Sequence, residues 1–336
     1  MVQTEHNIRL TSAEIAHLWS GYMGDSMARC VIKYFLAKVE DLEIKPLLEY
    51  SLHLSNQHLR VISDIFSHED IPIPHGFGDD DVNSNARRLY SDTFFLSYMK
   101  DTAKQGLALY ALALALSARS DVRNYFSECL ASTAELYNKV THVMLNKGLY
   151  IRPPYIPNAE SVEYVRHEGF LNGVFGDKRP FNAMEIAHLF ANIQTNALGK
   201  ALICEFAQTA KSDEVKKYFL RGKEIAHKQI EVFSSYLQDE DLPAPMTWDA
   251  DVLDSTDAPF SDKLMLFHIC GLNAAGVLNY GTALSVSLRR DLASAYVRLT
   301  GEIETYVDDG AELMINNGWM EKPPGTVDRR ALTAKK

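Results

Sequence analysis

Cysteine is scarce in this sequence. Of the 336 residues only four are cysteines, and no two of them form a Cys-x-x-Cys pair. A disulfide-dense scaffold is therefore excluded, and isolated cysteines within apolar, helix-like stretches are typical of reduced core residues in an intracellular protein. The four are Cys30, Cys129, Cys204 and Cys270.

Long hydrophobic runs are also missing. The longest covers residues 106–118 (GLALYALALALSA). Because a membrane-spanning helix needs about 20 apolar residues, we expect this segment to be a fully buried helix instead. The first ten residues are polar and lack the apolar stretch of a secretion signal. These absences predict a cytoplasmic protein that has no membrane partner.

Positive charge is in deficit, because 34 Lys and Arg residues stand against 44 Asp and Glu residues, a formal net charge of −10. Nucleic acids and anionic membranes carry the same sign, so we expect neither of them as a partner. The motifs G-x-S-x-G, G-x-G-x-x-G and the P-loop are absent as well. No motif therefore indicates nucleophilic catalysis or nucleotide binding.

What the sequence does contain is an internal repeat. LTSAEIAHLWSGY at residues 10–22 matches FNAMEIAHLFANI at residues 181–193, an offset of 171 positions. From Ser91 onward the offset becomes 170, and it holds as far as the Pro-Pro pairs that begin at Pro153 and Pro323. One deletion in a loop accounts for the change. A nearly constant offset over about 140 residues indicates a duplication.

Each copy is predicted to contain four helices, because apolar residues recur at helical spacing and no segment alternates convincingly with a period of two. We therefore predict an all-α protein, with a first copy at residues 8–150, a linker at 151–180 and a second copy at 181–325. The expected helices cover about 11–38, 44–67, 91–119 and 120–147, and then 183–211, 213–238, 261–289 and 291–317.

The lengths of the connections favour one topology. The first helix is joined to the second by a few residues, as is the third to the fourth, whereas about 20 residues separate the second from the third in each copy. A plain antiparallel meander does not need such a connection, but a ferritin-like bundle uses one long crossover. We predict two tandem ferritin-like four-helix bundles.

Several long segments carry a family resemblance, among them LTSAEIAHLW, IKPLLEYSLHLS and SDVRNYFSECL in the first copy and NYGTALSVSLRRDL in the second. In these segments the chain resembles a family of unknown function from spore-forming Gram-positive bacteria, whose members are described as spore coat proteins related to the coat F group. The resemblance implies tandem ferritin-like bundles and an association with sporulation. It brings no established catalytic residue.

A ferritin-like bundle raises the question of a dimetal site, which uses Glu and Glu-x-x-His side chains that face inward. Glu-x-x-His occurs three times. We interpret Glu14 and Glu185 as parts of capping boxes at helix starts. The third occurrence predicts a cluster in the second copy that could bind Fe, Mn or Zn: Glu205, Glu224, His227, His268 and Glu312. The equivalent positions of the first copy hold no carboxylate.

Two other features have more than one interpretation. The acidic runs Asp79–Asp81 and 249–254 lack the spacing of an EF-hand, and we predict solvated loops there. The small residues around Gly106 and Gly276 could leave an apolar tunnel for a small ligand, or they could allow close packing of helices.

The leading hypothesis is a non-enzymatic structural or interaction protein of the spore-coat type. Its partners would be proteins, such as other coat proteins or further copies of the chain. The alternative is a metal-binding or redox protein of ferritin-like type that uses the cluster in the second copy. For localisation we expect the cytoplasm, or deposition on the spore coat as the resemblance implies.

Overall fold

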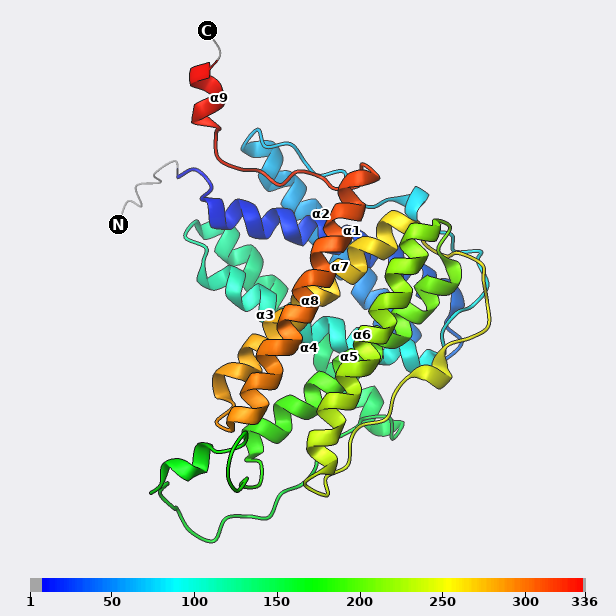
Figure 1. Ribbon diagram of the computed structural model, residues 1–336. Coiled ribbons are helices and arrows are strands. Elements are labelled where there is room, and N and C mark those ends of the chain that lie inside the picture. Colours follow the sequence, from blue (N-terminus) through cyan, green and yellow to red (C-terminus); the bar gives the residue numbers. More distant parts are fainter. Residues whose placement is uncertain (1–7, 335–336) are drawn as a thin grey trace, which may run out of the picture.

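The computed structural model describes residues 8–334, which form helices and two isolated β-bridges (Figure 1). We call α1–α4 the first repeat and α5–α8 the second repeat. Their bounds are α1 Ser12–Lys38, α2 Lys45–His68, α3 Asp92–Ala115, α4 Ser120–Asn146, α5 Ala183–Thr209, α6 Asp213–Gln238, α7 Asp262–Val286 and α8 Arg290–Asn316. A short helix, α9 (Arg329–Ala334), follows. The prediction of an all-α protein is confirmed for the described residues, and the expected helices agree with these bounds to within a few residues.

Local signals explain where the helices begin and end. Thr11 and Asn182 form capping boxes with Glu14 and Glu185, as predicted. α4 and α8 both end before a glycine with a left-handed backbone, at φ 67° and 68°, a conformation that a residue with a side chain rarely adopts.

Within each repeat the helices form two antiparallel hairpins that pack on each other. α1 pairs with α2 and α3 with α4, while α1 also contacts α3 and α2 contacts α4. The Asp92 carboxylate at the start of α3 accepts a hydrogen bond from the N–H of Asp41, just after α1 (2.8 Å). α3 therefore begins where α1 ends, and α2 and α3 run in the same direction. Asp262 does the same for Ser212 after α5 (2.7 Å).

A buried glutamate ties the opposite end of each repeat together. In the second repeat Glu185 is fully buried, and its carboxylate accepts hydrogen bonds from the N–H groups of Leu288 (3.0 Å) and Arg289 (2.9 Å) in the α7–α8 turn. It also pairs with Arg179 (2.8 Å). Burial alone would raise the pKa of Glu185, but these hydrogen bonds outweigh it and lower the pKa. Glu14 makes the equivalent backbone contacts in the first repeat.

The long crossovers between α2 and α3 and between α6 and α7 lie against each other rather than in solvent. Two antiparallel bridges join them, Val82 to Phe260 and Tyr90 to Val252. Because the offset is 170, the second bridge repeats the first with the roles of the two repeats exchanged. The same exchange relates the backbone hydrogen bond from Asn83 to Pro259 (2.7 Å) to the one from Leu253 to Leu89 (2.9 Å). The junction therefore has a pseudo-two-fold axis.

Two acidic residues of the crossovers complete this junction. The hydroxyl of Ser261, the N-cap of α7, donates to the carboxylate of Asp81 (2.6 Å), and Ser91, the N-cap of α3, donates to Asp251 in the same way. The prediction of solvated acidic loops is therefore wrong at these two positions. Its error has a physical cause: each crossover finds its hydrogen-bond partners about 170 positions away, where no local pattern can indicate them.

A continuous hydrophobic core follows from this junction, since buried side chains of both repeats belong to one cluster. Near the crossovers Tyr34 packs on Phe260 of the other repeat (5.3 Å between ring centroids), and Tyr98 bonds His268 (3.0 Å). A second, smaller cluster around Leu18 lies within the first repeat.

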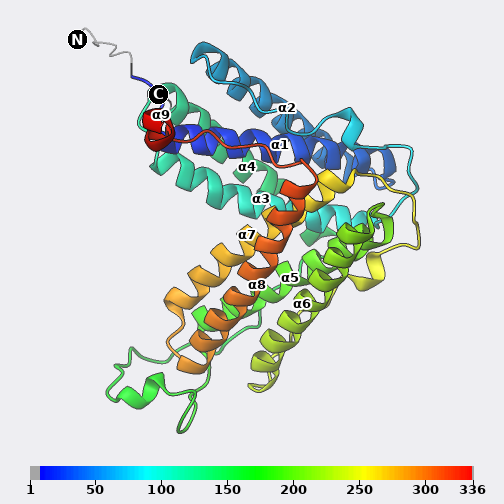
Figure 2. The same ribbon diagram turned by 45° about the horizontal axis from the view of Figure 1, so that its top comes forward.

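Away from the crossovers the two repeats diverge. The α3–α4 turn and the α7–α8 turn lie apart in both views (Figure 1 and Figure 2). As a result the apolar run at 106–118 is not fully buried, contrary to the prediction. Leu109, Leu112 and Leu116 are 50%, 46% and 51% exposed, because no helix of the second repeat covers this side of α3.

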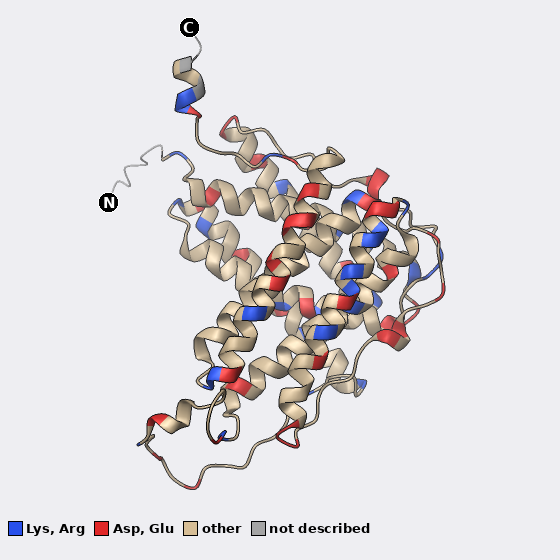
Figure 3. Cartoon of the chain, in the orientation of Figure 1, with Lys and Arg blue, Asp and Glu red and all other residues tan. Residues whose placement is uncertain are grey.

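The helices differ in how many charged residues they carry and in how long their apolar stretches are. Basic residues (Lys and Arg) and acidic residues (Asp and Glu) are interspersed along α6 and α8 (Figure 3). By length and composition one helix in the described part, α7, could cross a membrane. In the fold it packs against α5 and α8 with Leu264, Met265 and Leu266 fully buried, and the core helix of a water-soluble protein meets the same criteria.

We expect Glu185→Gln to lower the free energy of unfolding by about 1–3 kcal/mol at pH 7, because a neutral amide bonds Arg179 and the turn amides more weakly. The folded pKa of Glu185 is lowered, so its contribution is present above the unfolded pKa and is lost as the pH falls below about 4.3. Denaturant titrations between pH 3 and 7 measure this. Glu14→Gln is the matched control and should lose less, because Glu14 pairs with no arginine side chain within residues 8–334. A loss that does not change with pH would contradict the prediction.

Candidate functional site

The structure does not bring the five residues of the predicted metal cluster together. Glu205 and His268 are buried, whereas Glu224, His227 and Glu312 are exposed on the outer faces of α6 and α8. His227 instead faces Glu231 of its own helix (3.3 Å). Among residues 8–334 no group of three or more His, Cys, Asp or Glu side chains is placed to bind a metal ion. The placement of the five residues therefore does not support the metal-binding alternative.

Glu205 and His268 lie near the junction in a dry environment. In the part of the chain that is described, the two carboxylate oxygens of Glu205 have no hydrogen-bond partner. The Nδ1 of His268 has none either. Burial raises the pKa of Glu205 to about 9, and the nearby backbone N–H of Leu253, which donates its hydrogen bond to Leu89, offsets only part of this effect. Burial lowers the pKa of His268 to about 3. Both groups are neutral at pH 7, so this pair does not supply the negative charge that a cation site needs.

The first repeat contains a buried charged pair that the sequence analysis did not identify. The Nδ1 of His58 on α2 lies 3.2 Å from both carboxylate oxygens of Asp25 on α1, and 3.3 Å from the hydroxyl of Tyr110 on α3. Asp25 and His58 are 8% and 5% exposed. Burial alone would lower the pKa of His58, but Asp25 and the nearby Cys129 thiol outweigh it and raise the pKa to about 10. The imidazole is therefore charged at pH 7.

The second repeat holds a neutral network at the same positions. Asn196 takes the place of Asp25, and its side chain donates to the hydroxyl of Tyr280 (2.6 Å). Tyr280 donates in turn to Gln229, which takes the place of His58 (2.9 Å). The offset of 171 would have identified both substitutions, but a lone Asp and a lone His 33 positions apart give no motif. The polar link between helices therefore does not itself require charge.

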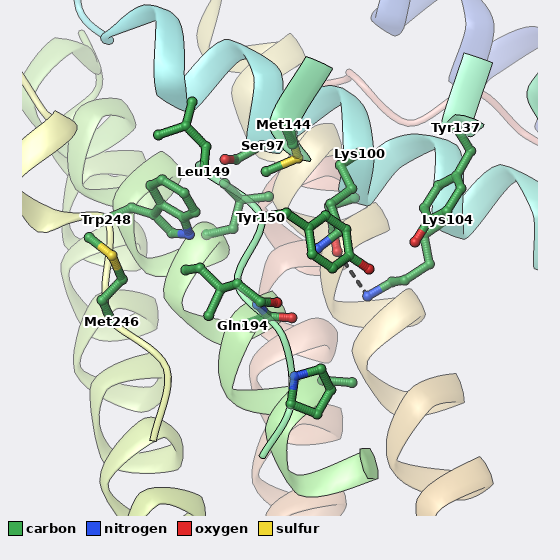
Figure 4. Close-up of a pocket in the computed structure, with 15 residues that line it drawn as sticks. Ser97, Lys100, Lys104, Tyr137, Met144, Leu149, Tyr150, Gln194, Met246 and Trp248 are labelled. Carbon is green, nitrogen blue, oxygen red and sulfur yellow. Dashed lines mark hydrogen bonds and ion pairs between the residues drawn. The ribbon is translucent and has the colours of Figure 1, made fainter. Parts of the chain in front are cut away.

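A cavity of about 210 Å³ lies where the two repeats and the linker meet (Figure 4). Its walls come from α3, α4, α5, the start of the linker and the crossover before α7. Trp248 and Leu149 lie on one side, and Lys100, Lys104 and Tyr137 on the other. The lining includes Ser97, Lys100, Lys104, Leu149, Tyr150 and Trp248.

The polar groups of this cavity differ in how well they are satisfied. Lys104 pairs with Asp101 (2.9 Å) and donates to Thr195 of the second repeat (2.9 Å). Lys100 has no ion pair within residues 8–334, and its ammonium lies 4.6 Å from the centre of the Tyr150 ring. Burial and the neighbouring Lys104 lower the pKa of Lys100. The hydroxyl of Ser97, a residue 5% exposed, is without a hydrogen-bond partner among the described residues.

The small residues around Gly106 allow close packing at that point. A Cβ placed on Gly106 would lie 3.2 Å from the Thr133 methyl group of α4. The neighbouring helix therefore fills the space beside Gly106. All four cysteines are unpaired, and Cys30 and Cys129 are buried.

Comparison with known proteins places the chain in a family. Residues 2–162 and 169–332 both match the family described as "Protein of unknown function (DUF3231)". The two matches cover most of the chain, so the protein belongs to this family and carries its domain twice. This confirms the duplication and the resemblance to a tandem family of unknown function.

One solved structure resembles part of the chain, that of a protein described as a "putative spore coat protein" from Bacillus halodurans C-125. It is 18% identical in sequence, and the similarity covers 45% of this chain and 98% of that chain with a TM-score of 0.41. No curated protein matches the chain.

We expect Asp25→Asn and His58→Gln each to lower the free energy of unfolding by about 3–5 kcal/mol, because each leaves the other partner as an unpaired buried charge. The double variant reproduces the neutral pair of the second repeat, and it should lie within about 1 kcal/mol of the wild type. Urea titrations of the four proteins give the coupling energy. The stability that His58 contributes is present below its unfolded pKa and is lost as the pH rises towards about 10. A double variant as unstable as either single variant would contradict this.

We expect Glu205→Gln to stabilise the protein by about 1–3 kcal/mol at pH 8 and by little at pH 5. The folded carboxyl has a raised pKa of about 9, so folding above the unfolded pKa requires the uptake of a proton, at a cost that increases up to pH 9. A glutamine is neutral in both states. Thermal unfolding of both proteins from pH 5 to 8 tests this, and a constant difference would show that Glu205 is ionised when folded.

Proposed function

We propose that the protein is a non-enzymatic structural protein of the spore-coat type that acts by binding other proteins. One observation carries this proposal: an exposed apolar surface on α3, which we call the α3 stripe and which consists of Leu109, Leu112 and Leu116. About half of each of these side chains is exposed.

The α3 stripe continues the junction between the repeats. At 3.6 residues per turn, Leu109, Leu112 and Leu116 lie on the same side of α3 as Tyr98. Tyr98 bonds His268 where the repeats meet. The stripe extends beyond this point, where the second repeat has diverged, and no charged residue occurs from 106 to 118. A contiguous exposed apolar surface of this kind marks a site of protein association more often than a solvated face.

The linker supports the same proposal with a second apolar surface. Between residues 155 and 175 seven large apolar side chains are exposed, and Tyr155, Val162 and Phe175 are 87%, 88% and 86% exposed. Aromatic side chains that are already held at the surface contribute much of the binding free energy in protein interfaces. The linker is fixed at its end by Arg179, which pairs with Glu185.

The proposal includes the finer architecture of each repeat. We propose that residues 8–150 and 181–325 are ferritin-like four-helix bundles joined by a linker at 151–180. Support comes from the parallel direction of α2 and α3, which requires one crossover along the length of the helices, as in ferritin-like topology. The proposed location in the spore coat rests on the family resemblance in sequence. The proposed partners are other coat proteins or further copies of the chain.

The test is a localisation experiment in the sporulating bacterium that encodes the chain. We expect a fluorescent fusion of the wild type to gather at the forming coat, and the variant Leu109→Ser/Leu112→Ser/Leu116→Ser to stay diffuse in the cytoplasm. The substituted side chains are half exposed, so the variant should fold, with a loss of stability within about 1 kcal/mol. Far-UV circular dichroism of the purified variant checks this.

The matched control is Leu278→Ser/Leu288→Ser. These two leucines of the second repeat are 46% and 48% exposed but lie outside the α3 stripe, so this variant should reach the coat. A wild-type fusion that stays diffuse would contradict the coat assignment. A stripe variant that localises like the wild type would contradict the role of α3.

A further inference from the structure

The pseudo-two-fold axis gives the contact between the repeats two equivalent halves, one on each side of the axis, and each half is called a junction below. The half without the cavity of Figure 4 can therefore be compared with the half that contains it. At the other junction Phe267 on α7 packs against Phe77 of the first crossover, with ring centroids 5.0 Å apart. The position equivalent to Phe267 is Ser97, and the position equivalent to Phe77 is Trp248. The aromatic ring that fills one junction is thus replaced by a hydroxyl at the other, and the cavity lies there.

The charged groups of the cavity are also specific to this junction. Lys100 and Lys104 correspond to Cys270 and Ala274 in the second repeat. Asp101, which also lines the cavity, corresponds to Gly271. Four lining positions of α3 therefore differ from their equivalents, and together they place one net positive charge beside the space. None of these changes is needed to join the repeats, because the other junction joins them with the rings of Phe267 and Phe77 in contact.

Two of these groups have no partner that would explain their presence in a structural role. Ser97 is 5% exposed, yet its hydroxyl makes no hydrogen bond with any described residue. A buried hydroxyl without a partner costs about 1–3 kcal/mol. Lys100, one turn further along α3, has an aromatic ring beside it and the Asp101 carboxylate nearby, but it forms no ion pair in the part of the chain that is described. Both would be satisfied by an anionic oxygen between them.

We propose that this cavity binds a small organic anion with an apolar body, of the size of one aromatic ring that carries a carboxylate or a phosphate. The acid group pairs with the ammonium of Lys100 and accepts a hydrogen bond from Ser97. The apolar body lies against Leu149 and Trp248. Lys104 keeps its contacts to Asp101 and Thr195, so its charge is balanced and the net positive charge at this end of the cavity is that of Lys100. This site is independent of the α3 stripe.

The experiment uses the full chain with benzoate and phenyl phosphate as probes. Isothermal titration calorimetry should show saturable binding of at least one of them, with one site per chain, and the probe should raise the melting temperature. Benzyl alcohol, which has the ring but no charge, should bind at least about tenfold more weakly. Acetate and inorganic phosphate, which have charge but no ring, should be weaker to the same degree.

Two variants assign the binding to the cavity. Ser97→Phe introduces the residue found at the equivalent position of the second repeat and fills the cavity. Lys100→Met removes the charge but keeps an apolar side chain of similar length. Each should weaken probe binding by at least about tenfold. The control is Lys139→Met, since Lys139 also lies over a tyrosine ring (4.2 Å from that of Tyr50) but does not line the cavity. Its affinity should equal that of the wild type.

Three outcomes would overturn the proposal. The first is that neither benzoate nor phenyl phosphate binds with saturation at millimolar concentrations. The second is that Lys100→Met and Ser97→Phe, shown by circular dichroism to be folded, bind the probe as tightly as the wild type. The third is that inorganic phosphate binds as tightly as phenyl phosphate, which would indicate an anion site without a role for the apolar wall.

Discussion

Each crossover of about 20 residues contains only one short 3₁₀ helix, so most of its backbone N–H and C=O groups must find partners elsewhere. Here each crossover finds some of these partners in the other one, through the reciprocal pairs that join Asn83 to Pro259 and Leu253 to Leu89. The same segments supply the carboxylates that hold Ser91 and Ser261 at the starts of α3 and α7. The positions of these helices, the shared core and the cavity all depend on this exchange.

Around that symmetric junction the two repeats have diverged in chemistry while they keep their helices in place. The first repeat links α1 and α2 by a charged pair, Asp25 and His58, and the second uses neutral amides. Conversely, Tyr34 of the first repeat bonds the backbone at Arg87 (2.7 Å), while Glu205 at the equivalent position has no partner among the described residues. Fold and function thus separate: shared positions maintain the architecture, and unshared ones are the places to look for binding.

Local signals sufficed to predict the eight helices, since the capping boxes at Thr11 and Asn182 and the apolar periodicity depend on neighbours in sequence. The repeat itself was visible because its offset is constant. What could not be predicted was which helix faces meet across the junction. Glu224 and Glu205 share a repeat, yet one faces solvent and the other the core, and Leu109 lies on an apolar helix that no second helix covers. Such facts depend on contacts between segments about 170 residues apart.

The covalent linker between the repeats has an evolutionary consequence. In a homodimer of single repeats, any change at the symmetric interface would appear in both subunits at once, so a hollow with a lysine beside it would weaken both junctions together. Within one polypeptide each half mutates separately. Phe267 can keep its packing at one junction while Ser97 leaves a cavity at the other. Gene fusion thereby lets a symmetric scaffold acquire a pocket at one junction while the other still holds the repeats together.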